Sequence, residues 1–155
     1  MTNRALAAPP RRAEQERRAL AKDGEASGNA AMPERILIVE DDYLVASELE
    51  ATLTDAGFQV VGVASTADQA IRLARTQRPD LAVVDVRLIG RRDGVDAAVT
   101  MFNEFGLRSI FATAHDDADT RERAKQASPI AWLAKPYTPA RLIPLIRSAL
   151  SSLRS

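Results

Sequence analysis

The amino-acid sequence predicts an α/β fold, a doubly wound parallel sheet with helices on both faces, and three observations predict it. From residue 35 onward, five short apolar runs alternate with five segments of helical character, and this alternation is typical of parallel strands joined by right-handed crossovers. The runs at residues 36–39 and 81–84 are apolar throughout, as expected of strands buried on both faces. Acids follow the first run directly, so they must lie at the edge of the sheet, because burying an unpaired carboxylate is costly.

The first half of the predicted sheet contains two strands and two helices. The strands are expected at residues 35–40 and 58–64, and the helices at residues 43–56 and 67–77. The first helix carries its large apolar side chains on one stripe, formed by Leu44, Val45, Leu49 and Leu53. Gly57 ends this helix, as glycine often does at a C-terminus, and Thr66 is a typical N-cap for the next one.

The second half continues the alternation to the end of the chain. Strands are expected at residues 80–86, 107–113 and 130–134, and helices at residues 95–105, 116–127 and from 139 to 153. The last helix follows Thr138-Pro139, a cap residue with proline at the first helical position. Pro144 lies inside this helix and cannot donate to the Ala140 carbonyl, so we expect a kink or a late start.

The composition limits the class of protein. The chain has 155 residues, 21 Lys plus Arg, 21 Asp plus Glu and no cysteine. Balanced charge gives no indication of nucleic acid or an anionic membrane as a partner, and the lack of cysteine excludes disulfides and thiolate metal sites. No apolar stretch approaches the roughly 18 residues of a membrane span, and no signal-peptide layout is present. We therefore expect a cytoplasmic protein that binds neither nucleic acid nor membrane.

The composition also divides the chain into an extension and a domain. Residues 1–33 form an extension rich in Ala, Arg and Glu, with a predicted helix at residues 11–22. Leu20 is almost the only large apolar residue of that helix, which would be marginal alone. The extension is therefore either a flexible, solvated segment or an arm that binds a partner or forms a dimer. Residues 34–153 form the predicted folded domain.

Reactive side chains stand at the C-terminal ends of four predicted strands, which meet at the edge of a parallel sheet where ligands bind. They are three acids after the first strand and one acid, one threonine and one lysine after later strands: Glu40, Asp41, Asp42, Asp85, Thr113 and Lys135. Clustered carboxylates suit a hard divalent cation, Mg²⁺ before Ca²⁺ where phosphate oxygens complete the shell. One acid can then act as a nucleophile, while the ammonium and the hydroxyl bind a transferring phosphoryl group. Asp42 is expected to serve only as the first acid of the following helix.

In the order and spacing of these residues the chain resembles the receiver domains of bacterial two-component response regulators. The resemblance covers residues 34–153 and implies a flavodoxin-like (βα)5 fold with strand order 2-1-3-4-5. It implies that Asp85 attacks the phosphohistidine of a sensor histidine kinase and becomes an aspartyl phosphate. It also implies that Mg²⁺ is held by Glu40, Asp41, Asp85 and the main-chain carbonyl of Arg87.

The resemblance implies further roles at the fourth and fifth strands. Thr113 would move toward the phosphoryl group and donate its hydroxyl, and Lys135 would bind a phosphoryl oxygen. The peptide bond between Lys135 and Pro136 is expected to be cis. Trp132 lies at the family's aromatic switch position, where it either turns inward when the threonine moves or simply packs. Such a protein is not an enzyme in the usual sense, but it catalyses its own Mg²⁺-dependent phosphorylation and dephosphorylation.

The loop after Asp85 departs from the common receiver pattern. It lacks the usual Met/Leu-Pro pair, carries three arginines, and places Gly94 nine rather than eight residues after Asp85. Together with Phe-Ala-Thr at residues 111–113, this loop resembles a subgroup common in alphaproteobacteria and often partnered with kinases of the HWE/HisKA2 type. We hypothesise that Arg87 shields the phosphoryl group from water and lengthens its lifetime. His115, the one histidine, is either a solvated loop residue or a participant.

No output domain is expected after the last helix, so signalling would proceed by protein–protein interaction. Residues 128–155 contain no acid but include Lys135, Arg141, Arg147 and Arg154. The reciprocal acid–base pairs that hold common regulator dimers therefore cannot form there in the usual way. The last helix is more apolar than one buried stripe requires. We expect an interface on this helix, either a homodimer, with the N-terminal arm crossing between subunits, or a kinase-binding surface.

Three other classes of protein share parts of this pattern. A phosphohydrolase of the haloacid dehalogenase kind needs a second Asp two residues after the nucleophile, where this chain has Arg87. A flavin- or nucleotide-binding module needs a Gly-rich phosphate loop after the first strand, where this chain has three acids. A receiver-like module for interaction or dimerisation without phosphorylation would keep the same residues, so only a phosphorylation assay separates it.

Overall fold

The computed structural model describes residues 32–155. The helix predicted at residues 11–22, and with it the proposed dimer arm, lies outside the described residues. Within residues 32–155, no helix has both the length and the apolar character needed to cross a lipid bilayer.

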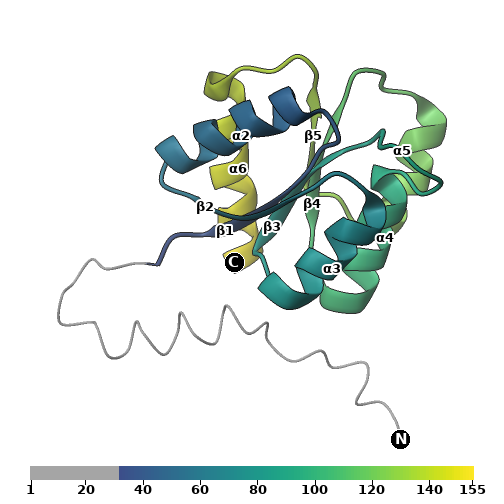
Figure 1. Ribbon diagram of the computed structural model, residues 1–155, viewed down its shortest axis with the longest axis horizontal. Helices are drawn as coiled ribbons and strands as arrows, with labels where there is room; N and C mark the ends of the chain where they lie inside the picture. Colours follow the sequence, from purple (N-terminus) through teal and green to yellow (C-terminus); the bar gives the residue numbers. More distant parts are fainter. Residues whose placement is uncertain (1–31) are drawn as a thin grey trace, which may run out of the picture.

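Across residues 32–155, five parallel strands form one sheet in the order β2-β1-β3-β4-β5, which confirms the predicted order (Figure 1). The strands are β1 (Arg35–Val39), β2 (Gln59–Ala64), β3 (Leu81–Asp85), β4 (Ser109–Thr113) and β5 (Ala131–Ala134). β1 and β3 are neighbours, and their register pairs Val39 with Val84. Glu40 follows Val39 and Asp85 follows Val84, so the two acids lie next to each other at the C-terminal edge of the sheet.

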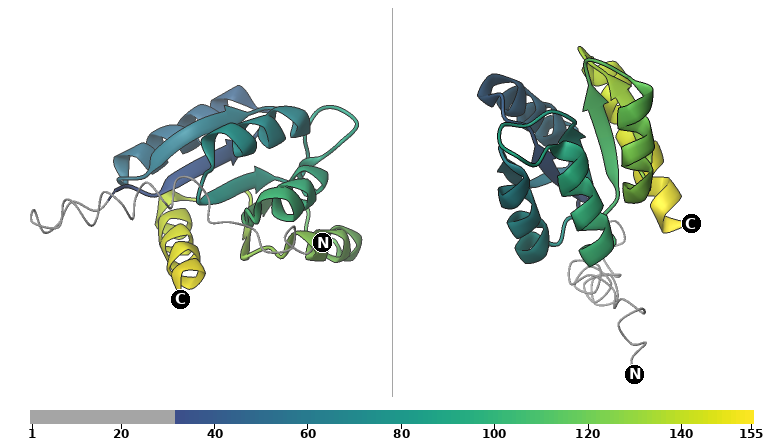
Figure 2. Two further views of the ribbon diagram at one scale, coloured as in Figure 1. Left: turned by 90° about the horizontal axis from the view of Figure 1, so that it is seen from below. Right: turned by 90° about the vertical axis from the view of Figure 1, so that its right-hand side faces the viewer.

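Helices cover both faces of the sheet (Figure 2). They are α2 (Tyr43–Asp55), α3 (Ala67–Gln77), α4 (Gly94–Phe105), α5 (Ala118–Ala124) and α6 (Pro139–Arg154), with a 3-10 turn at Lys125–Ala127. One core joins α2 and α6 to the sheet, and a second core joins α3, α4 and α5 to its opposite face. This two-sided burial confirms the doubly wound α/β class.

The continuous apolar runs are explained by this two-sided burial. Along β1, Ile36 and Ile38 pack in the core with α2 and α6, whereas Leu37 and Val39 pack in the core with α3 and α4. Both faces of a central parallel strand exclude water, so a strand with polar side chains on alternate positions would be unstable there. The chain becomes polar only where the strand leaves the sheet, and this places the acids at the edge.

Two predicted elements begin two residues later in the structure than the sequence indicated. The helix expected at residues 116–127 begins at Ala118, because the Asp117 carboxylate caps it by accepting from the Thr120 N–H at 2.8 Å. The strand expected from residue 107 begins at Ser109, because the Leu107 N–H bonds back to the Met101 carbonyl and completes the end of α4. Both differences result from capping at a helix end.

The last helix begins where its cap predicts. The Thr138 hydroxyl accepts from the Arg141 N–H at 3.3 Å, and α6 starts at Pro139 and runs on through Pro144 to Arg154. The late start considered for this helix is therefore wrong, because the cap fixes its first turn ahead of Pro144. A kink at Pro144 stays a prediction.

Candidate functional site

Three carboxylates meet at the C-terminal edge of the central strands. Glu40 and Asp41 follow β1, Asp85 ends β3, and one oxygen from each lies within 4.8 Å of the others. Glu40 is held in place by its own backbone, since its N–H donates to the Ala64 carbonyl at 2.8 Å, and its side chain is only 4% exposed. The sequence predicted this grouping, and the structure brings all three side chains together.

Glu40 and Asp85 are both nearly buried, and this affects the charge of Glu40. Burial of the carboxyl raises the pKa of Glu40, and the neighbouring Asp85 carboxylate raises it further. The Asp42 N–H, which donates to Glu40 Oε2 at 3.1 Å, and the positive charge of Lys135 act in the opposite direction but do not cancel the rise. Close packing of acids under low solvent exposure therefore favours an added cation or a proton at this point.

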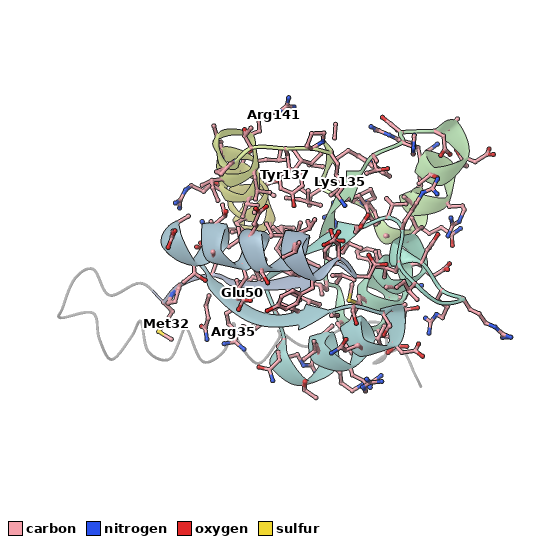
Figure 3. The ribbon with its side chains drawn as sticks, turned by 45° about the horizontal axis from the view of Figure 1, so that its top comes forward. Met32, Arg35, Glu50, Lys135, Tyr137 and Arg141 are labelled. Atoms are coloured by element: carbon pink, nitrogen blue, oxygen red, sulfur yellow. The ribbon has the colours of Figure 1, made fainter. Side chains whose placement is uncertain are left out.

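Lys135 reaches the acids from the end of β5. Its Nζ donates to Glu40 Oε1 at 3.2 Å and to Asp85 Oδ2 at 3.1 Å. Burial alone would lower the pKa of Lys135, but the charges and hydrogen bonds of Asp85 and Glu40 outweigh burial and raise it. The bond between Lys135 and Pro136 is cis, as predicted. Lys135 and Tyr137 lie in the connection between β5 and α6, beside α2 (Figure 3).

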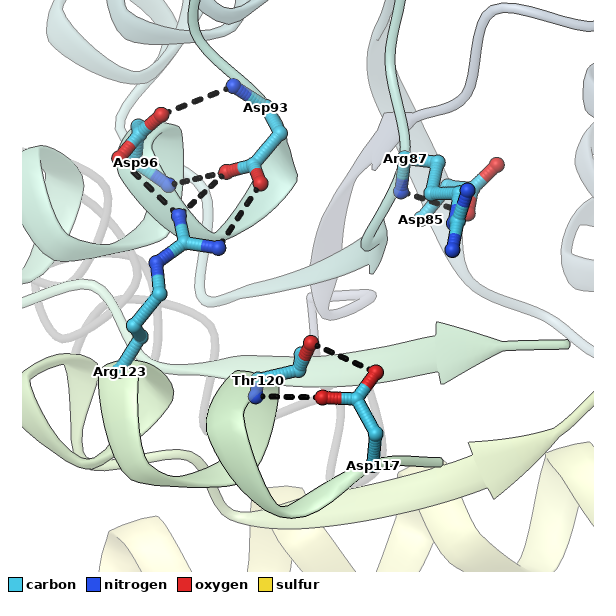
Figure 4. A network of polar contacts seen from close by, with 7 residues as sticks. All are labelled: Asp85, Arg87, Asp93, Asp96, Asp117, Thr120 and Arg123. Carbon is cyan, nitrogen blue, oxygen red and sulfur yellow. Dashed lines mark hydrogen bonds and ion pairs between the residues drawn. The ribbon is translucent and has the colours of Figure 1, made fainter. Parts of the chain in front are cut away.

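The donor set suits a hard divalent cation. Three carboxylates face one ammonium, so negative charge remains in excess, and the acids offer only oxygen ligands. Mg²⁺ prefers such oxygens and keeps other positions for water or phosphate. Asp85 is further oriented by the Arg87 N–H, which donates to Asp85 Oδ1 at 3.2 Å (Figure 4).

Thr113 ends β4 beside the acids, but its hydroxyl is occupied by its own loop. The hydroxyl donates to the His115 carbonyl at 2.8 Å and accepts from the His115 N–H at 3.1 Å. The His115 side chain is exposed, and both contacts to the Thr113 hydroxyl come from the His115 backbone. To bind another acceptor, the Thr113 hydroxyl must give up its bond to the His115 carbonyl.

Trp132 on β5 is half-buried between two groups. Its ring centroid lies 4.9 Å from that of the fully buried Phe111, its partner in the β4–β5 register. The Arg121 guanidinium lies 4.4 Å from the Trp132 ring centroid. The sequence predicted a switch or packing role for Trp132 but missed Arg121, because no short motif links a helical arginine to a strand eleven residues later.

The loop between β3 and α4 is fixed at its far end. Asp93 and Asp96 form a capping box at the start of α4, and Arg123 of α5 donates to both carboxylates (Figure 4). Partial burial would raise the pKa of Asp93, but the Arg123 guanidinium and the Asp96 N–H lower it overall. Gly94 packs directly on Asp85, since a Cβ at Gly94 would lie 1.9 Å from the Asp85 carbonyl oxygen. The capping spacing was detectable in the sequence, whereas the Arg123 contact was not.

A cleft of about 740 Å³ opens beside the acids, between α2 and the connection from β5 to α6. Its wall is mainly apolar and also includes Glu48, Lys135 and Tyr137. Tyr43 and Leu44, on the first turn of α2, are 79% and 72% exposed. The sequence did not reveal this cleft, because it is formed by two segments about ninety residues apart.

The response regulator receiver domain family matches residues 36–147 of the chain. The chain belongs to this family. This match confirms the expected family, and the strand order confirms the expected fold. Receiver domains of two-component response regulators generally bind Mg²⁺ in an acidic pocket of this kind.

Three similar proteins illustrate the family. The transcriptional regulatory protein PdtaR of Mycobacterium tuberculosis is 38% identical over 126 residues, which are 81% of this chain and 61% of PdtaR. The phyllosphere-induced regulator PhyR of Methylorubrum extorquens is 37% identical over 123 residues, which are 78% of this chain and 45% of PhyR. The chain thus spans less than two thirds of either regulator. The signal receiver domain of a modulated diguanylate cyclase from Desulfovibrio desulfuricans is 37% identical, with a TM-score of 0.74, covering 79% of this chain and 97% of that domain.

Proposed function

We propose that the receiver domain accepts a phosphoryl group on Asp85 from a sensor histidine kinase, with Mg²⁺, and signals by protein–protein interaction. The observation that carries the proposal is the joining of three carboxylates within 4.8 Å to one lysine that bonds to two of them. Receiver domains are typically phosphoacceptors rather than enzymes acting on a separate substrate, so the catalysis proposed here is limited to the domain's own phosphorylation and dephosphorylation.

Each residue has a defined task in the proposed transfer. An Asp85 carboxylate oxygen attacks phosphorus, the P–N bond of the kinase phosphohistidine breaks, and the imidazole leaves with the electron pair of that bond. Lys135, now 3.1 Å from Asp85 Oδ2, binds an oxygen of the transferred group. Mg²⁺, when held by Glu40, Asp41, Asp85 and the Arg87 carbonyl, neutralises the charge on the phosphoryl oxygens.

Thr113 provides the response to phosphorylation in this proposal. Its hydroxyl is buried at the sheet edge and bonds only to the His115 backbone among described groups. A phosphoryl oxygen on Asp85 is a stronger, charged acceptor than a backbone carbonyl. The hydroxyl therefore exchanges the His115 carbonyl for the phosphoryl group, and the loop after β4 moves with it.

Arg87 governs how long the phosphoryl group persists in this proposal. Its N–H orients Asp85 and its exposed side chain extends from the loop directly after the phosphoacceptor. A guanidinium over the phosphoryl group would keep out the attacking water. Arg87→Ala should therefore lose phosphate faster than wild type, and an unchanged rate of loss would contradict this role.

Partner and assembly follow from other surfaces. The Phe-Ala-Thr sequence at residues 111–113 and the arginine-rich loop support a kinase of the HWE/HisKA2 type as the phosphoryl donor. On α6, Ile143, Leu145 and Leu153 remain only partly buried although they are apolar, which supports a homodimer through this helix. A cytoplasmic location fits a receiver that exchanges phosphate with a kinase.

The function is tested by incubating the protein with acetyl phosphate and Mg²⁺ and measuring its intact mass. Wild type should gain about 80 Da, the mass of one phosphoryl group, and a chelator should abolish the gain. Asp85→Asn should not gain mass, whereas the matched control Asp55→Asn, at the exposed end of α2, should behave as wild type. No gain in wild type would instead indicate an interaction module that works without phosphorylation.

A further inference from the structure

Trp132 is held by a group outside the β-sheet. It is the only tryptophan of the chain, and it packs against the buried core through Phe111. The exposed Arg121 of α5 lies over its ring at 4.4 Å. A guanidinium stacked on an indole is attracted by the ring quadrupole and covers the ring from water. The position of Trp132 therefore depends on α5 as well as on the sheet.

Arg121 is itself fixed by the loop that follows the threonine. Its Nε donates to Asp116 Oδ1 at 2.7 Å and its Nη2 donates to Asp116 Oδ2 at 2.8 Å. Two parallel bonds fix the plane of the guanidinium, so its orientation over the indole is set by Asp116. The bidentate geometry distinguishes the Arg121–Asp116 ion pair from exposed ion pairs with a single contact, which contribute little to stability.

Asp116 lies directly beyond the backbone that binds the Thr113 hydroxyl. Thr113 makes its two hydrogen bonds to the carbonyl and the N–H of His115, the residue before Asp116. If the hydroxyl leaves for another acceptor, the His115 carbonyl loses its partner and the backbone at Asp116 is free to shift. If Asp116 shifts while α5 stays in place, Arg121 cannot keep both hydrogen bonds to Asp116 and its stacking on the Trp132 ring.

The other side of α5 is anchored elsewhere. Arg123 donates to Asp93 and Asp96 at the start of α4, with distances of 3.0 to 3.3 Å. The Asp117 cap also holds the first turn of α5 through two bonds to Thr120. With α5 fastened to α4, movement of the loop changes the Asp116–Arg121 contact rather than carrying the helix along.

We propose that Arg121 is a positioning residue, a latch that holds Trp132 in its present place while Thr113 is bonded to His115. This inference rests on the proposed function, because it takes the phosphoryl group on Asp85 as the acceptor that withdraws Thr113. The latch stabilises the unphosphorylated arrangement, since only there can Arg121 contact Asp116 and Trp132 together. Removing the latch should increase the fraction of molecules in the phosphoryl-binding arrangement.

The latch is tested with beryllofluoride, an analogue of the phosphoryl group, and Mg²⁺ on the full chain. Trp132 emission provides the titration signal, because no other tryptophan contributes. Arg121→Ala and Asp116→Ala each break the latch. Arg72→Ala is the matched control, an exposed arginine on α3. Intact mass after acetyl phosphate treatment is measured for every variant.

In wild type the emission should change as beryllofluoride binds, and in Arg121→Ala part of that change should be present before addition. The apparent affinity for beryllofluoride should rise about two- to fivefold in Arg121→Ala and in Asp116→Ala, and Arg72→Ala should match wild type. A merely structural arginine would leave the affinity unchanged or lower it.

Two failures remain distinguishable. A mass gain in wild type with unchanged Trp132 emission, or with equal affinities in wild type and Arg121→Ala, overturns the latch and leaves the phosphoacceptor intact. No mass gain and no beryllofluoride binding in wild type overturns the proposed function, and the latch as its consequence.

Discussion

The contact between Gly94 and Asp85 gives the most exacting test of how the phosphoacceptor is positioned. In Gly94→Ala the new Cβ would lie 1.9 Å from the Asp85 carbonyl oxygen and 2.9 Å from Val84 Cγ1. Ordinary contacts of this kind exceed about 3.4 Å, so the start of α4 must move away from β3 by more than about 1 Å. Neither neighbour can move away easily, because the closest atom belongs to the backbone of a buried strand and Val84 is a fully buried, β-branched side chain.

The expected loss of stability follows from the groups that must move. Overpacking a core costs about 1–3 kcal/mol. The shift also strains the hydrogen bond from the Gly94 N–H to the Val86 carbonyl, now 2.8 Å, and leaving such a buried group unpaired costs about 1–3 kcal/mol. Alanine's better helix propensity returns at most about 1 kcal/mol. We expect the free energy of unfolding to fall by about 2–4 kcal/mol.

Urea denaturation of wild type, Gly94→Ala and Gly57→Ala measures this loss. Gly57 is the matched control, because a Cβ there meets nothing within 4 Å and only its φ of 97° opposes a side chain. That strain costs about 1–2 kcal/mol. Gly94→Ala should lose more stability than Gly57→Ala and should also slow phosphorylation by acetyl phosphate. A loss at Gly94 no larger than at Gly57 would show that α4 does not press on Asp85 as described.

Three further outcomes are expected. Because the pKa of Glu40 is raised in the folded state, the folded protein binds more protons than the unfolded protein as pH rises above 4.5. Without Mg²⁺, the free energy of unfolding of wild type should therefore fall over that pH range relative to that of Glu40→Gln. Parallel pH profiles for the two proteins would contradict this. Mg²⁺ at a hundred times its dissociation constant should raise the free energy of unfolding by about 2.7 kcal/mol. Asp41→Asn should lose most of this stabilisation. An equal stabilisation of that variant would show that Asp41 is not a ligand of Mg²⁺. Arg123→Ala should lower the free energy of unfolding by about 1 kcal/mol at low salt and by less at 1 M salt, because the Arg123–Asp93 ion pair is partly exposed. Arg72→Ala should stay within about 0.5 kcal/mol of wild type. Equal losses in these two variants would show that Arg123 does not hold α5 to α4.

The sequence predicted the sheet and its reactive edge well because both depend on local patterns. The apolar run before Glu40 requires burial on both faces, and the acids after it cannot enter the core, so strand and edge are determined together. The same reasoning placed Asp85 and Lys135, which the structure brings within 3.1 Å. The cis bond before Pro136 followed from the family resemblance and is present.

The contacts that restrain the site could not be predicted in the same way. Arg121 and Arg123 belong to one polar helix, and nothing in their sequence shows that one faces Trp132 and the other faces Asp93. Such contacts depend on how helices pack across the sheet rather than on periodicity. The hydrogen bonds from the Thr113 hydroxyl to the His115 backbone were also missed. The sequence places a threonine at the end of the strand, but it does not show whether the hydroxyl points toward the acids or toward the following loop.

The most direct test of the proposed function is to locate the phosphoryl group. Wild type is phosphorylated with acetyl phosphate and Mg²⁺ and treated with borohydride, which reduces an aspartyl phosphate to homoserine, and the modified residue is identified by peptide mass mapping. We expect homoserine at position 85 and at no other acid, and none when a chelator is present. Homoserine at position 41, 5-hydroxynorvaline (the product from a glutamyl phosphate) at position 40, or no reduced residue at any of the three acids would contradict the assignment of Asp85 as the phosphoacceptor.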